Sequence, residues 1–78
     1  MDVRELRQHM GREGIRADLI DTGTPWQSEC YVVTERDGGW VAYYAERGLE
    51  RSLTAFATED EACRHVLGKL RADPSARR

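Results

Sequence analysis

Two stretches decide the fold, WVAYYAERG at residues 40–48 and FATEDEAC at residues 56–63. The first is rich in aromatic and β-branched residues and ends on a glycine, as a strand that enters a tight turn does. The second begins a helix, because Thr58 precedes Glu61 by three residues in the capping-box pattern. The sequence therefore predicts a strand over residues 40–46, a returning strand over residues 49–57 and a helix after Thr58.

The predicted second helix has one apolar face and a clear end. Asp73-Pro74 stops it, because proline cannot continue a helix, and we expect residues 73–78 to fray. The residues at helical spacing on its apolar face are Ala62, Cys63, Val66, Leu67 and Leu70.

The chain before residue 40 adds another strand and a first helix. Residues 29–36 alternate in the manner of a strand, and the glycines after Asp37 predict a hairpin turn at residues 37–38 or 38–39. Residues 17–22 predict a short strand at an edge of the sheet.

A first helix is predicted near the start of the chain. Asp2 is its N-cap, and Val3, Leu6 and Met10 follow at helical spacing. Its end lies at Gly14 or, one turn earlier, at Gly11.

The order of these elements predicts one α+β domain over residues 1–72. A helix, three to four antiparallel strands and a second helix follow one another, with both helices on one face of the sheet. If both hairpin turns have an even number of residues, the alternation of side chains along the strands places one set of residues on each face of the sheet. The bulkier set, expected to face the helices, is Tyr31, Val33, Trp40, Ala42, Tyr44, Leu53 and Ala55. The opposite set is Cys30, Val32, Thr34, Val41, Tyr43, Ser52 and Thr54.

The composition excludes several function classes. A net charge of −2 provides no basic footprint for nucleic acid, and no apolar run has the length of a membrane span. The helix-strands-helix order also occurs in double-stranded-RNA-binding domains. However, such domains place lysine where the second helix begins, and this chain has Glu59, Asp60 and Glu61 there.

Neither catalysis nor a metal or cofactor site is expected from the titratable residues. His9 and His65 are the only imidazoles, and no Ser-His-Asp, zinc or phosphate-loop pattern is present. Cys30 and Cys63 would pair only in an oxidising compartment. The charged, amphipathic first ten residues favour a cytoplasmic protein with two reduced thiols. Eleven arginines against one lysine indicate a bacterial source.

Charge is distributed unevenly along the chain. Residues 17–37 have five acids and one base, Arg36, a balance of −4, whereas residues 62–78 have five bases and one acid, Asp73, a balance of +4. The alternative interpretations are ordinary solvated surface and an acidic face for a partner. On the second interpretation the candidate partner-binding residues are Glu35, Asp37, Tyr43, Glu46 and Arg47.

The second half of the chain contains Trp40, Tyr43-Tyr44 and Glu46-Arg47-Gly48, followed by residues 56–63 and an apolar helix. In these residues the chain resembles small bacterial immunity-type proteins of polymorphic toxin systems. The resemblance covers roughly residues 29–70. It implies a cytoplasmic, non-catalytic protein that binds and occludes a cognate toxin. The alternative is a small structural or homodimeric domain that uses an open sheet face or an edge strand.

Overall fold

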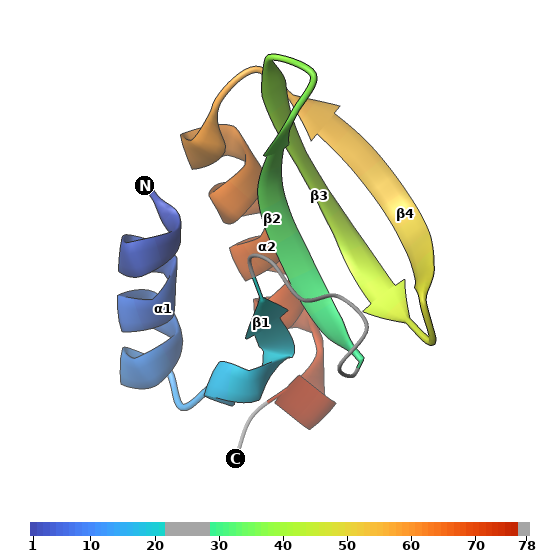
Figure 1. Ribbon diagram of the computed structural model, residues 1–78. Coiled ribbons are helices and arrows are strands. Elements are labelled where there is room, and N and C mark those ends of the chain that lie inside the picture. The colour runs from blue at the N-terminus through green and yellow to red at the C-terminus, as the bar shows by residue number, and fades with distance from the viewer. Residues whose placement is uncertain (22–28, 77–78) are drawn as a thin grey trace.

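The computed structural model describes residues 1–21 and 29–76. The elements are α1 (Val3–Arg12), the 3-10 helix η1 (Ala17–Leu19), β1 (Ile20–Asp21), β2 (Cys30–Arg36), β3 (Gly39–Glu46), β4 (Leu49–Phe56), α2 (Glu59–Ala72) and the 3-10 helix η2 (Pro74–Ala76). The strands form one sheet in the order β1-β2-β3-β4, and both helices lie on the same side of it (Figure 1). The predicted α+β class, with helix, antiparallel strands and helix in that order, is confirmed.

The first edge of the sheet differs from the prediction. β2, β3 and β4 are antiparallel, but β1 pairs with β2 in parallel, with Ile20 opposite Tyr31. The strand expected over residues 17–22 is reduced to two residues, because Ala17–Leu19 winds into a 3-10 turn. Residue 22 lies outside the described residues.

Both hairpins turn through two residues with positive φ. Asp37 and Gly38 have φ of 54° and 79°, and Arg47 and Gly48 have φ of 52° and 82°. Two successive residues of this conformation make the turn whose twist matches that of the flanking strands. The first turn therefore lies at residues 37–38, so that Arg36 pairs with Gly39.

The helix-covered face matches the prediction in β2 and β3. Val33 and Ala42 are buried in the main core, and Tyr31 and Trp40 pack against it at partial exposure. The predicted apolar face of α2 is buried throughout. Leu6 and Met10 bring α1 into the same core, beside α2.

A β-bulge corrects the face assignment in β4. Ala42 pairs with Thr54 and Tyr44 with Arg51, so Ser52 and Leu53 both lie opposite Tyr43. The extra residue inverts the rest of the strand. Thr54 therefore shares the helix side with Ala42, and Ala55 lies opposite Val41 on the other face. Our assignment of Leu53 and Ala55 to the core was wrong, and Phe56 packs against the core instead.

A second apolar cluster lies on the sheet face away from the helices. It consists of the buried residues Cys30, Val32, Val41, Tyr43 and Ala45. Cys63 belongs to the main core on the other side of the sheet. Both cysteines are therefore buried, on opposite sides of the sheet.

The helix ends follow from local hydrogen bonds. Gly14 has a φ of 72° and donates to the carbonyl of Gly11, while the N–H of Ile15 donates to Met10 at 2.9 Å. This is the Schellman pattern that ends a helix on a glycine, so the later of the two predicted ends is correct. Thr58 caps α2 by accepting from the N–H of Glu61 at 3.2 Å. The Glu61 carboxylate in turn accepts from the Thr58 hydroxyl at 3.2 Å.

The end of the described chain is docked. Pro74–Ala76 forms a 3-10 turn, Ala76 is buried in the main core, and its carbonyl accepts from the N–H of Arg16 at 2.9 Å. The prediction that the chain frays from residue 73 onward is therefore wrong for residues 74–76. Arg77 and Arg78 lie outside the described residues.

Candidate functional site

The five predicted partner-binding residues do not form one site. Glu35 and Asp37 lie at the β2–β3 hairpin, and Glu46 and Arg47 lie at the β3–β4 turn, at the other end of the sheet. The eight residues of β3 lie between the two groups. Tyr43 lies between them on the face away from the helices and is 4% exposed.

The hairpin end carries a shallow hollow of about 410 Å³. Glu35 is exposed in β2 and lies opposite Trp40 of β3. Glu59, at the start of α2, also lines the hollow and accepts a hydrogen bond from the N–H of Val3 at 3.0 Å. An indole ring beside two carboxylates suits the cationic side chain of a partner.

Tyr43 takes part in a contact that spans three strands. The guanidinium of Arg36 in β2 donates to both carboxylate oxygens of Glu50 in β4, at 3.1 and 2.8 Å. The same guanidinium lies 5.5 Å from the centroid of the Tyr43 ring. Burial, followed by the charge of Glu50, raises the pKa of Tyr43, and the hydrogen bond from Arg36 lowers the pKa of Glu50. Arg36 and Glu50 thus connect β2 with β4 across the outer face of β3.

β4 is an open edge strand, and no pattern in its sequence indicates this position in the sheet. It pairs with β3 alone among the strands, and seven of its eight residues are exposed. Leu49 and Leu53 are 56% and 43% exposed. Alternate residues of an edge strand point their backbone N–H and C=O groups away from the sheet. β4 therefore offers both backbone groups and apolar side chains to a further strand.

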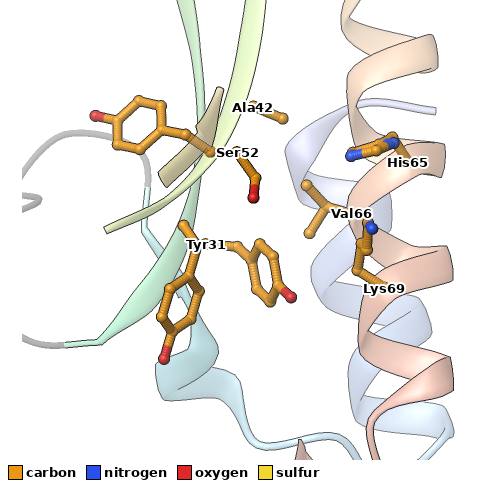
Figure 2. A pocket seen from close by; sticks show the side chains of 8 residues that line it. Tyr31, Ala42, Ser52, His65, Val66 and Lys69 are labelled. Carbon is orange, nitrogen blue, oxygen red and sulfur yellow. The ribbon is translucent and has the colours of Figure 1, made fainter. Parts of the chain in front are cut away.

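A small cavity of about 80 Å³ separates the sheet from α2 next to β4. Figure 2 shows Tyr31, Ala42 and Ser52 on the strands and His65, Val66 and Lys69 on the helix. The rings of Tyr31 and Tyr44 meet edge to face at 5.1 Å, and the ring of His65 lies 5.1 Å from that of Phe56. Burial raises the pKa of Tyr31 and of Tyr44.

The cavity could not be predicted from residue spacing. In the sequence, His65 stands out only as one of two imidazoles, and Lys69 only as one of the five bases in residues 62–78. His65 and Lys69 are one turn apart on the same side of α2. These two residues and Ser52 line the same cavity because of the way α2 crosses the sheet and because of the bulge in β4.

Within residues 1–21 and 29–76, no three His, Cys, Asp or Glu side chains are grouped so as to hold a metal ion. Neither helix in the same residues is long and apolar enough to cross a membrane. No family model, curated protein or solved structure gave a significant match to this chain.

Proposed function

We propose that this protein is a non-catalytic protein-binding module that pairs with a strand of its partner along β4. We further propose that the partner is a cognate bacterial toxin, which the protein occludes as a cytoplasmic immunity protein. The observation that carries the proposal is the open edge of β4, with seven of eight residues exposed. Strand addition uses such an edge, because main-chain hydrogen bonds supply affinity and neighbouring side chains supply specificity.

The acidic hairpin supports a basic partner. Glu35 and Asp37 are exposed near Trp40, at one end of the molecule. Exposed carboxylates at the rim of an interface speed the association of a basic protein, and salt screens this effect. Glu46 ends β3 and Arg47 lies in the turn before β4, so both are close to the point where a strand added along β4 would begin or end.

The strand-addition proposal is tested with the Leu49→Lys/Leu53→Lys variant. Both leucines are exposed, so the fold should persist, while charged lysines on an edge strand oppose pairing with another strand. Affinity for the toxin encoded beside this protein, measured by calorimetry, should fall at least about tenfold. Gln8→Lys/Gly11→Lys, at two exposed positions of α1, adds the same positive charge and is the control. Unchanged binding by the double variant would remove β4 from the interface.

The electrostatic part is tested by single charge reversals. Glu35→Lys and Asp37→Lys should each slow association with the toxin, most strongly at low salt. Asp18→Lys changes the net charge equally but lies on η1, away from the hairpin, and should leave the association rate nearly unchanged. Co-expression then tests the immunity role, because the wild type should rescue cells from the toxin and Glu35→Lys/Asp37→Lys should rescue them less well.

The alternative role is a homodimeric or purely structural domain, and the same edge strand favours it. A second copy would pair with β4 about a two-fold axis perpendicular to the sheet. Sedimentation of the isolated protein over a range of concentrations distinguishes the two functions. A dimer that Leu49→Lys/Leu53→Lys dissociates, together with no binding to any neighbouring gene product, would replace the toxin proposal.

A further inference from the structure

The cavity beside β4 is lined by hydrogen-bond donors from both of its walls. The hydroxyl of Ser52 comes from the bulge in β4, and the imidazole of His65 and the ammonium of Lys69 come from α2. Figure 2 shows these three groups on the two sides of the same space. None of the lining residues is an aspartate or a glutamate, in a chain that contains fourteen of them.

The bulge and two short side chains create this space. α2 crosses β2 and β3 and touches β4 less extensively. Ala42 and Ser52 fill little volume, and Ser52 has the positive φ of 56° that the bulge requires. The opening therefore lies where α2 no longer covers the sheet, and Val66, Tyr31 and Tyr44 are among the residues that line it.

Lys69 differs from the other basic residues of α2. Arg64 pairs with Asp60 at 2.8 Å, and Arg71 pairs with Glu13 at 2.6 Å. Among the ion pairs of the described residues, none involves Lys69. The carboxylate of Asp73 influences Tyr31, and those of Glu29 and Glu46 influence Tyr44, but none of the three lines the cavity.

We propose that this cavity binds a carboxylate group through Lys69, His65 and Ser52. A volume of about 80 Å³ equals roughly two to three water molecules at ~30 Å³ each, which suits a carboxylate and not an aromatic ring. Lysine and hydroxyl donors form charge-assisted hydrogen bonds to such a group. The apolar wall behind them excludes part of the competing water.

The source of the carboxylate is an aspartate or glutamate of the strand that pairs with β4. Neighbouring strands lie roughly 4.8 Å apart. A side chain on the helix side of the added strand therefore starts next to Ser52 and Thr54, at the mouth of the cavity. This assignment of the source rests on the proposed strand addition, whereas carboxylate binding itself does not.

Acetate tests the cavity alone. Titration of the ¹⁵N-labelled protein with sodium acetate, at ionic strength held constant with chloride, should give saturable amide shifts at Ser52, His65 and Lys69. Lys69→Gln should weaken acetate binding by about fivefold, the upper range for an exposed charge pair. Lys69→Arg should retain binding, and Arg7→Gln, which removes one exposed charge on α1, should match the wild type. Absent shifts, or equal shifts in Lys69→Gln, would overturn the proposal.

Blocked peptides distinguish the sources. A short β-forming peptide with a central glutamate should shift the cavity residues and also the backbone amides along β4, and its glutamine counterpart should bind several-fold more weakly. If acetate saturates the cavity while neither peptide shifts β4, the carboxylate belongs to a free small molecule and the strand source is wrong. If both peptides shift β4 equally and acetate has no effect, strand addition stands and the carboxylate site fails.

Discussion

Cys63 shows how burial sets the chemistry of a single residue in this protein. Its side chain is enclosed by the main core, and desolvation, followed by the charge of Glu59, raises its pKa from 9.0 to about 11. In the unfolded chain the thiol ionises near its ordinary pKa, so the unfolded state holds fewer protons than the folded state between these two values. Stability therefore falls as pH rises through this window.

The shift of about two pKa units corresponds to about 2.8 kcal/mol in full, at about 1.4 kcal/mol per unit. We predict that Cys63 removes about 2 kcal/mol of this stability between pH 9.0 and about pH 11, because each end of the window lies at one of the two pKa values, where titration is incomplete. Urea unfolding at both ends of the window measures this loss. Tyr31, Tyr43 and Tyr44 also have raised pKa values and act in the same direction. The loss attributable to Cys63 is therefore the difference between the wild type and Cys63→Ala, and identical pH profiles would contradict the prediction.

Two glycines of the helical part should respond in opposite ways to a methyl group. Gly68 lies inside α2, and a Cβ there would meet open space, so Gly68→Ala should stabilise the protein by about 0.5–1 kcal/mol through the unfolded state. Gly14 also has room, but its φ of 72° is the left-handed conformation of a helix end. Gly14→Ala should therefore destabilise by roughly 1–2 kcal/mol. Thermal unfolding of both variants checks the pair, and a shared sign would show that the backbone conformation does not control the effect.

At the scale of elements, α2 depends on its first turn. Thr58 holds the N–H of Glu61, and Glu59, Asp60 and Glu61 place carboxylates at the positive end of the helix. Thr58→Ala should cost about 1 kcal/mol in urea unfolding, the usual loss for a cap. Thr58→Ser keeps a hydroxyl acceptor and should recover most of that loss. An equal cost for both substitutions would mean that packing of the threonine methyl group, and not the cap, stabilises the helix.

At the scale of the whole molecule, the second 3-10 turn joins the end of the described chain to its beginning. Ala76 is buried beside the core, and its carbonyl accepts the N–H of Arg16. Ending the chain at Asp73 should destabilise it by about 1–2 kcal/mol, from one lost hydrogen bond and the exposure of apolar surface. A chain ending at Ala76 is the control and should unfold like the wild type. Equal stability of both truncated chains would show that the docked turn contributes nothing.

Local patterns in the amino-acid sequence were enough to predict the helices, the three long strands, the helix caps and the hairpins. Thr58, Gly14 and the Asp37-Gly38 turn act on groups within about five residues, so their effect is readable without knowledge of the fold. The α+β class and the helix-facing residues of β2 and β3 follow from the same periodicities. Of the candidate partner-binding site, the sequence predicted only five residues. The structure places two of them at each end of the sheet and buries the fifth, Tyr43, between them.

Tertiary structure decided what depends on distant partners. The bulge at Ser52 shifts β4 by one residue, and because side chains alternate along a strand, this small change exchanges the two faces. The docking of Ala76, the open edge of β4 and the cavity of Ser52, His65 and Lys69 all join residues far apart in the chain. Their arrangement results from how α2 packs across the sheet, which no pattern of neighbouring residues specifies.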